Sequence, residues 1–327
     1  MRDETRDLIR GLNIFEMLTV NLSSNSLFDH AELGDSFVTY ADTLFPTFAF
    51  LSGMSPMPLK RGVELVGLGL AFNAMGAVRS QQFKPRYVGV LQRMGLSALF
   101  VNAFGQTPGF PLTATALWTA LTVAGADDPK DPLATPQGSF QSKVDCAVLG
   151  QSSLYRPEYD PEGLLGSIGT ALSMYAGSYF IRNFSDNSAL EQAGIGAVAA
   201  LSGIVLSKVL PQVYPLSKIW WTPSFALFSS GYAIVKYALV RLAHPYLPQS
   251  VKYGLTNLGK KTLEIYLTDA VLHAVLGGTG IWEKAKNFLA QYVGTTAADL
   301  GLVTASNFLM IYISTLYVEN GIRLRLL

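Results

Sequence analysis

Charged residues are scarce in this chain. Asp, Glu, Lys and Arg make up 14% of its 327 residues, against roughly 25% in an average soluble domain. The formal net charge of +1 excludes the strong positive field that nucleic-acid binding uses, so no nucleic-acid partner is expected. Half of the residues are hydrophobic and the mean hydropathy is +0.30. This composition is typical of a protein that lies in a lipid bilayer.

Cysteine is nearly absent. Cys146 is the single cysteine, which excludes an intramolecular disulfide and a cysteine-based metal site, and we expect no metal. A cleavable signal pattern is also lacking, so the first apolar run, which follows "MRDETRDLIR", is predicted to be retained as a span.

Several stretches contain no charge over nearly the length that crosses a bilayer, which is about 20 residues. They are residues 43–59, 163–181, 219–235 and 300–318. A longer uncharged run from Met94 to Ala126 is interrupted by "GQTPGFP", whose glycines and prolines predict a tight turn between two spans.

These patterns predict an all-α polytopic transmembrane helix bundle with about ten spans, in which residues 1–327 form a single membrane-embedded domain. Many segments are rich in Gly, Ala and Ser, which let helices approach closely in lipid. The predicted spans are residues 9–24, 38–56, 62–79, 87–104, 110–126, 162–181, 190–210, 219–241, 256–277 and 299–319.

One long polar segment, residues 127–161, contains several prolines and scattered acids. It predicts an extramembrane loop that could cover a site. The distribution of Lys and Arg mildly favours a cytoplasmic N-terminus, which would place His30 and this loop together on the non-cytoplasmic side.

Ionisable residues within predicted spans indicate function unless they are paired. Arg93 in "VGVLQRMG" requires either a carboxylate or an anionic ligand. Asp269 and His273 are four residues apart in "TLEIYLTDAVLHAV", so they are expected to share a helical face as a buried, satisfied pair.

The stretch "NLSSNSLFDHAELGDSF", residues 21–37, places His30 among polar neighbours between two apolar segments, with Asn21 at the end of the preceding span. A neutral imidazole can accept a proton near physiological pH. A neighbouring amide can orient it or stabilise developing negative charge. A solvated His30 and a helix-capping Asn21 are the alternative interpretation.

Five stretches in order resemble the heparan-α-glucosaminide N-acetyltransferase family. They are "DLIRGLNIFEMLTVN" (7–21), "HAELGDSFVTYADTLFPTFAFLSGMS" (30–55), "VGVLQRMG" (88–95), "LGQSSLYRPEYDPEGLLGSIGTALSMYAG" (149–177) and "SKIWWTPSFALFSSG" (217–231). The similarity extends over residues 7–275, and "YDPEGLLG" and "VLQRMG" are its most specific parts.

This resemblance implies a multispan enzyme that moves acetyl from acetyl-CoA across a membrane to an amino sugar or a similar acceptor. The family's functional histidine matches His30 and its asparagine matches Asn21. His30 would either act as general base on the acceptor amine in a ternary complex, which we favour, or carry the acetyl group covalently.

Further site residues are expected beside this pair. The donor's phosphates need cations or polar groups, and the residues expected to bind it are Arg93, Gln92, Lys218 and Arg10. The residues expected to bind the acceptor substrate are Asp42, Asp160, Glu162 and Trp221. The Asp160-Pro161-Glu162-Gly163 stretch is also predicted to start the sixth span, because proline favours a first helical position.

The chain departs from the family pattern where Lys261 replaces a typical asparagine and Asp269 a histidine. Two alternatives therefore stay open: an inactive family member that serves as a membrane scaffold, and a transporter or channel for polar solutes. The expected partners are membrane lipid, an amine or hydroxyl acceptor and, as one option, a second copy in a homodimer. The expected location is an endomembrane resembling the vacuole or lysosome, or the plasma membrane.

Overall fold

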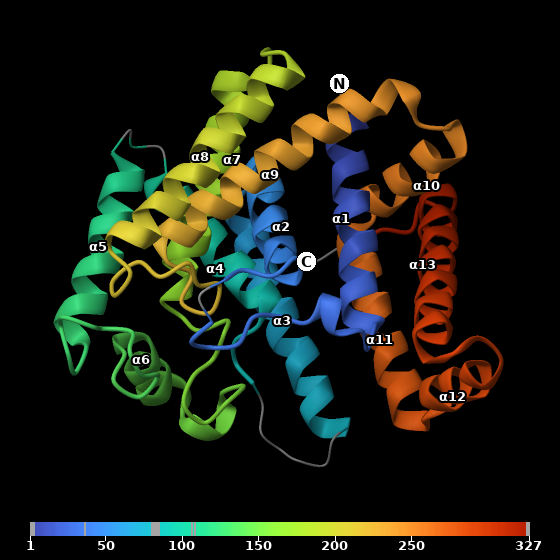
Figure 1. The fold of residues 1–327 in the computed structure, drawn as a ribbon, viewed down its shortest axis with the longest axis horizontal. Coiled ribbons are helices and arrows are strands. Elements are labelled where there is room, and N and C mark those ends of the chain that lie inside the picture. Colours follow the sequence, from blue (N-terminus) through green and yellow to red (C-terminus); the bar gives the residue numbers. More distant parts are fainter. Residues whose placement is uncertain (1–3, 36, 80–85, 106, 108, 325–327) are drawn as a thin grey trace. The chain divides into compact units, whose positions relative to one another are not determined.

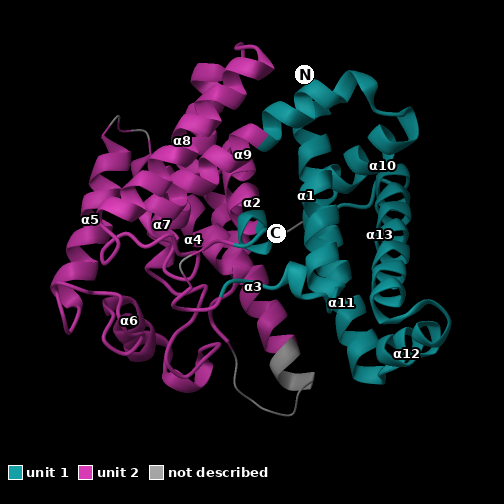
Figure 2. Ribbon diagram, viewed as in Figure 1, with its two compact units in different colours: residues 1–31, 39–44, 236–327 teal, residues 32–38, 45–235 magenta. Residues whose placement is uncertain are grey.

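The computed structural model describes residues 4–35, 37–79, 86–105, 107 and 109–324. All regular elements in this part of the chain are helical, apart from one isolated bridge between Arg156 and Tyr159. The predicted all-α class is confirmed for these residues. They form two compact units whose segments interleave along the chain (Figure 2), and the prediction of a single membrane-embedded domain stays a prediction.

The first unit comprises residues 1–31, 39–44 and 236–327, the beginning and the end of the sequence (Figure 1). Its α-helices are α1 (Glu4–Leu22), the last part of α9, α10 (Gln249–Lys260), α11 (Thr262–Thr279), α12 (Ile281–Val293) and α13 (Thr295–Glu319). Short 3₁₀ turns are η1 (Ser26–Phe28), η2 (Ala41–Thr43) and η4 (His244–Tyr246).

Helix α1 is the centre of this unit. Its buried apolar side chains, including Leu8, Ile14 and Leu18, recur at helical spacing and so face one side. This side packs against α10, α11 and α13. The unit therefore joins α1, near the beginning of the sequence, to α10, α11 and α13, near its end.

The second unit comprises residues 32–38 and 45–235. Its helices are α2 (Leu44–Gly53), α3 (Leu59–Arg79), α4 (Val90–Phe104), α5 (Phe110–Gly125), α6 (Phe140–Leu149), α7 (Gly166–Phe184), α8 (Ala189–Val209) and the first part of α9 (Pro223–Ala243), with a 3₁₀ turn η3 (Gln151–Ser153). Helix α4 packs against α3 and α7, and α5 packs against α7.

Aromatic residues form one core of the second unit. Phe110 and Trp118 lie eight residues apart on α5 and pack with Ile168 of α7 and with Trp220. Leu133, from the segment predicted as an extramembrane loop, belongs to the same cluster. The loop is therefore anchored to the helices on either side of it.

The segment 127–161 contains helix α6, which the sequence analysis missed. The Ser139 side chain accepts a hydrogen bond from the backbone N–H of Ser142 and so caps the helix start. Lys143 pairs with Asp127 at 2.7 Å, and Gln141 donates to Thr122 of α5 at 2.7 Å. These contacts explain why a proline-rich segment is ordered here.

Within the described residues, three helices are long and apolar enough to cross a membrane, judged by length and composition: Ala189–Val209, Pro223–Tyr246 and Thr295–Glu319. Helices α4 and α5 are apolar but shorter. Each predicted span contains a helix, but α2, with ten residues, rises only about 15 Å, half of a bilayer's hydrocarbon core. The predicted ninth span is also divided, because Lys261 interrupts the helix between α10 and α11.

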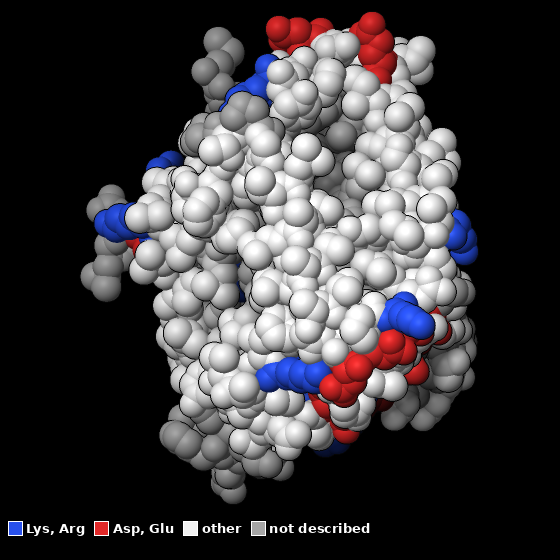
Figure 3. Space-filling view, turned by 90° about the vertical axis from the view of Figure 1, so that its left-hand side faces the viewer, with Lys and Arg blue, Asp and Glu red and all other residues white. Residues whose placement is uncertain are grey.

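Helix α8 presents its apolar side chains outward. Its buried residues are polar or small, namely Gln192, Gly196, Gly203 and Ser207. Large apolar residues on it are exposed, such as Val198 at 66% and Leu201 at 59%. Such an inverted pattern suits a lipid-facing helix. Figure 3 likewise shows a face with a broad area free of Lys, Arg, Asp and Glu between charged groups near its upper and lower ends.

The contact between α1 and α10 depends on two glycines. A Cβ on Gly11 would lie 1.7 Å from the carbonyl oxygen of Leu255, and a Cβ on Gly259 would lie 1.7 Å from that of Asp7. The two backbones are therefore too close for any side chain at either position.

We expect Gly11→Ala to lower the free energy of unfolding by about 1–3 kcal/mol, because the helices must separate. Gly301→Ala is the matched control, since nothing lies within 4 Å of its added Cβ. Thermal unfolding of both purified variants in detergent measures the difference. Equal unfolding midpoints for the two would show that the α1–α10 contact adapts without cost.

Candidate functional site

His30 and Asp42 form a hydrogen-bonded pair in the first unit. The Nδ1 atom of His30 lies 2.8 Å from Oδ1 of Asp42. The Asp42 side chain is 3% exposed, whereas the His30 side chain is 51% exposed. A buried carboxylate thus holds one nitrogen of an imidazole whose ring still reaches the surface.

Asp42 is itself fixed by the chain around it. Its Oδ2 atom accepts hydrogen bonds from the backbone N–H of Ala31 at 3.2 Å and from the backbone and hydroxyl of Thr39 at 3.2 and 3.0 Å. These bonds compensate the burial of the carboxylate. The same bonds hold Ala31 and Thr39, the residues that flank segment 32–38, beside Asp42 of the turn η2.

The tautomer of neutral His30 follows from this network. With Nδ1–H donating to the carboxylate, Nε2 carries the lone pair that can accept a proton. The carboxylate also stabilises the imidazolium that forms, as the aspartate does in the Ser-His-Asp triad. The described contacts of Asp42 orient His30, and the expected role of Asp42 in substrate binding stays a prediction.

Asn21 lies in the last turn of α1 and has a different partner. Its side-chain amide donates to Asp269 of α11, and Nε2 of His273 lies 3.7 Å from Oδ1 of Asp269. The predicted shared face of Asp269 and His273 is confirmed, but the pair is not satisfied as expected, because these two atoms have no hydrogen-bond partner among the described residues. The described contacts thus connect His30 to Asp42 and Asn21 to Asp269, and the predicted common pocket for His30 and Asn21 stays a prediction.

Two other sequence features of the first unit have structural partners. Lys261 binds the backbone carbonyl of Ile322 and pairs with Glu264 at 3.7 Å, so the lysine at the departure from the family pattern holds the segment after α13. Arg10, expected at the donor site, pairs with Asp7 at 3.8 Å on α1.

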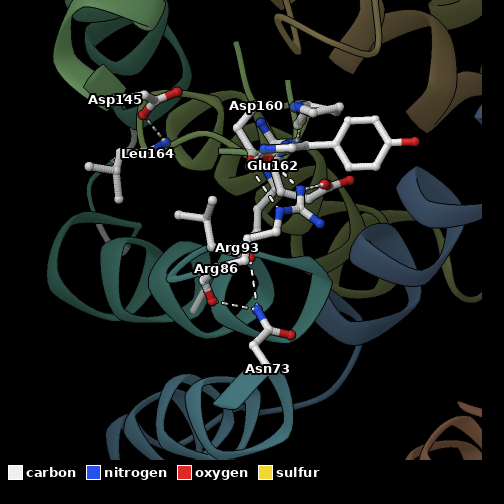
Figure 4. A network of polar contacts seen from close by, with 10 residues as sticks. Asn73, Arg86, Arg93, Asp145, Asp160, Glu162 and Leu164 are labelled. Atoms are coloured by element: carbon white, nitrogen blue, oxygen red, sulfur yellow. Dashed lines mark hydrogen bonds and ion pairs between the residues drawn. The ribbon is translucent and has the colours of Figure 1, made fainter. Parts of the chain in front are cut away.

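A network of charges lies in the second unit (Figure 4). Arg86, just before α4, binds Asp160 through two nitrogens, with Nε to Oδ2 at 2.9 Å, and also binds Glu162. Burial disfavours the charge on Arg86, but the hydrogen bonds and negative charges of these two acids outweigh it and raise the pKa of Arg86. Both acids, expected to bind the acceptor, are thus engaged by an arginine that the sequence analysis did not select.

Asp160 has further bonds that explain a wrong prediction. Its carboxylate accepts from the backbone N–H groups of Tyr155 and Glu162, both at 2.9 Å. The segment from Asp160 therefore folds as a turn around this carboxylate, and helix α7 begins at Gly166 instead of Pro161.

Arg93 is the most deeply buried cation of the network. It is 1% exposed, its Nη1 donates to the carbonyl of Pro161, and its guanidinium lies 5.0 Å from the ring centre of Trp221. Its Nε and Nη2 atoms have no hydrogen-bond partner among the described residues. The charges nearest to it are those of Glu162, Asp160 and Asp145, so the guanidinium lacks a direct carboxylate contact.

Two glycines of "DPEGLLG" make room for this network. A Cβ on Gly166 would lie 1.4 Å from Nη2 of Arg93, and a Cβ on Gly163 would lie 2.0 Å from Oδ2 of Asp145. The close packing against the side chains of Asp145 and Arg93 therefore explains why the motif has glycine at both positions.

The remaining predicted residues lie near Arg93 in the chain or in space. Gln92 is 2% exposed and its Nε2 has no partner in the described part of the chain. Trp221 is fully buried, and its indole donates to Ser173 at 3.2 Å. Its φ of 44° is costly for a bulky residue. Lys218 is half-buried and accepts the Trp221 N–H through its backbone carbonyl.

Asp145 of α6 is a buried acid at the edge of this network. Its Oδ1 accepts the N–H of Leu164 at 2.9 Å. Burial, which exceeds the stabilising effect of that bond, raises the pKa of Asp145 to about 6. The carboxyl is therefore poised to titrate just below neutral pH.

No family model matches the chain, and no curated protein matches it. Within the described residues, no group of three or more His, Cys, Asp or Glu could hold a metal ion.

The pKa of Asp145 predicts a pH-dependent stability. Because the folded-state value of about 6 exceeds the ordinary 3.8, the folded protein binds the proton more tightly. Stability therefore falls as pH rises between these values, by at most about 3 kcal/mol. Asp145→Asn keeps the acceptor for Leu164 without ionising. We expect its unfolding midpoint to exceed that of the unsubstituted chain at about pH 8 and the gap to narrow toward about pH 4.

Asp131→Asn, an exposed residue of the same segment, is the control and should show no such pH dependence. A constant difference between the Asp145→Asn protein and the unsubstituted chain across this range would contradict the assignment.

Proposed function

We propose that this chain is a membrane-embedded acyltransferase of about ten spans that moves acetyl from acetyl-CoA to the amine of an amino-sugar-like acceptor. The observation that carries the proposal is the pair formed by half-exposed His30 and buried Asp42. The resemblance to the acetyltransferase family, at the residues quoted above, supports the choice of reaction.

In this mechanism His30 acts as general base. Its Nε2 takes a proton from the acceptor amine. At the same time the amine nitrogen attacks the thioester carbonyl, and a C–N bond forms. The tetrahedral intermediate then expels the coenzyme A thiolate, and the C–S bond breaks. The thiolate takes from the imidazolium the proton that the amine gave up. The products are the N-acetylated acceptor and free coenzyme A, and Asp42 stabilises the imidazolium between the two steps.

Asn21 is proposed to stabilise the carbonyl oxygen as it becomes negative. An asparagine side chain has two N–H donors, so a bond to Asp269 leaves a second N–H for the substrate. This contact to Asp269 also constrains the amide's rotation, which supports a preorganised donor.

Arg93 is the proposed principal residue for the donor's phosphates, with Gln92, Lys218 and Arg10 as further contributors. The support is that Arg93 retains two nitrogen atoms, Nε and Nη2, whose N–H groups have no partners among the described residues. The proposed residues for acceptor binding are Asp160, Glu162 and Trp221. Arg86 pairs with both acids, and the guanidinium of Arg93 lies over the Trp221 ring, so one network holds all three.

The principal test is acetyl transfer by the purified chain in phospholipid nanodiscs, with glucosamine as acceptor. We expect His30→Ala to lower turnover about 10²- to 10⁴-fold, the usual contribution of a general base, with acetyl-CoA binding retained. Asp42→Asn should lower turnover and leave KM nearly unchanged, because it weakens both the orientation of the imidazole and the stabilisation of the imidazolium.

His244→Ala is the matched control, since His244 is a partly exposed histidine whose nearest acid, Glu4, is 3.8 Å away. Full activity of the His30→Ala protein would end this mechanism. Accumulation of radiolabel on His30 from acetyl-CoA alone would instead establish the covalent route.

Acetyl-CoA binding tests the donor site separately. We expect Arg93→Gln to raise the Kd for acetyl-CoA at least about tenfold, the equivalent of one charge-assisted bond. An unchanged Kd together with a lowered unfolding temperature would give Arg93 a purely structural role. Absence of acetyl-CoA binding by the unsubstituted chain would favour the transporter or scaffold alternatives.

A further inference from the structure

Helix α12 has a polar face and an apolar face of nearly equal width. At 100° per residue, Ile281, Phe288 and Tyr292 fall within about 40° of one another. The polar side chains lie outside this strip: Glu283 and Asn287 are about 160° and 120° from its centre, and Gln291 and Lys284 flank it at about 80° and 60°.

The apolar face is not covered by the described protein. No residue of α12 is buried, and the exposed fractions are 53% for Ile281, 58% for Phe288 and 72% for Tyr292. The rings of Phe288 and Tyr292 contact each other, with centres 5.4 Å apart. A continuous apolar strip is therefore presented outward.

Lys286 shows which side of α12 faces the rest of the unit. Its side chain is 17% exposed, pairs with Glu283 at 2.8 Å and reaches Ser24 after α1 at 3.5 Å. Because Phe288 is about 160° from Lys286 around the helix, the apolar strip points away from this contact.

The position of α12 in the chain identifies what covers the strip. Gly294, with φ of 84°, separates α12 from α13, a helix long and apolar enough to cross a membrane. In Figure 1 α12 lies at the end of the unit where α11 ends and α13 begins. Helix α13 exposes apolar side chains of its own, including Phe308 at 63% and Tyr312 at 61%.

Helix α12 itself is unsuited to cross a bilayer. Its 13 residues rise only about 20 Å, and they include three charges. A short helix with separate apolar and charged faces instead suits the boundary between headgroups and acyl chains, with Tyr and Trp near that level.

We propose that α12 is an interfacial helix that lies along the surface of a lipid bilayer. Ile281, Phe288 and Tyr292 contact acyl chains, while Lys284, Asn287 and Gln291 face headgroups and water. The proposal concerns lipid contact alone and does not depend on acetyl transfer.

Collision measurements on spin labels test this arrangement in the full chain. Cys146→Ser removes the single cysteine, after which labels are attached to Phe288→Cys or Tyr292→Cys in phosphatidylcholine nanodiscs. Asn287→Cys and Gln291→Cys are matched controls, each one position away on the same helix. We expect oxygen to collide far more often than a water-soluble nickel chelate at 288 and 292, and the reverse at 287 and 291.

Two results would overturn the proposal. Equal access of the nickel chelate to 288 and 287 would place the strip in water. Low collision rates for both reagents, with dipolar broadening between labels at 288, would make the strip a contact between two copies of the chain.

A native reporter keeps the test decisive if a labelled variant does not fold. Trp282 lies on α12, and its emission is obtained by subtracting the spectrum of the Trp282→Phe protein. We expect that emission to be quenched more by lipids brominated near the headgroup than by lipids brominated near the chain end. Quenching by neither lipid would contradict the interfacial position.

Discussion

A charge removed from water must be met by an opposite charge or by directed hydrogen bonds, and both units are arranged around that requirement. In the second unit Arg86 neutralises Asp160 and Glu162, and the turn that precedes α7 is folded around the same carboxylates. In the first unit Lys236 of α9 binds Asn13 and Glu16 of α1. With so few charges available, these buried pairs connect segments that are far apart in the chain.

The sequence identified helical segments where apolar residues run without interruption. The predicted span 190–210 closely matches α8 (Ala189–Val209), because residues 192–207 carry no charge and the two charged residues, Glu191 and Lys208, lie in its end turns. Helices α6 and α12 were missed, since each is short and alternates polar with apolar residues, which in composition resembles a loop. The interruption at Lys261 was also missed, and the lysine's partner, the carbonyl of Ile322, lies 61 residues further along the chain, where no local pattern reveals it.

The candidate site was only partly accessible to sequence reasoning. His30 was recognised from its polar surroundings, but its partner Asp42 was assigned to substrate, since twelve residues of irregular chain separate the two. The signal available in the sequence was that Asp42 stands directly before the apolar helix α2. Similarly, Arg93 was selected because it lies within an apolar helix, whereas Arg86 lies outside one and carries the stronger ion pairs.

The interleaving of the two units has a consequence for biosynthesis. Roughly 230 residues are synthesised between α1 and α10, the first of the helices that pack on its face. At 5–20 residues per second, roughly 10–50 s pass before these partners exist. The second unit lies between these segments in the chain and can assemble during that interval. Until α10 and α13 follow, the face of α1 that they cover in the folded unit has to be shielded by other contacts.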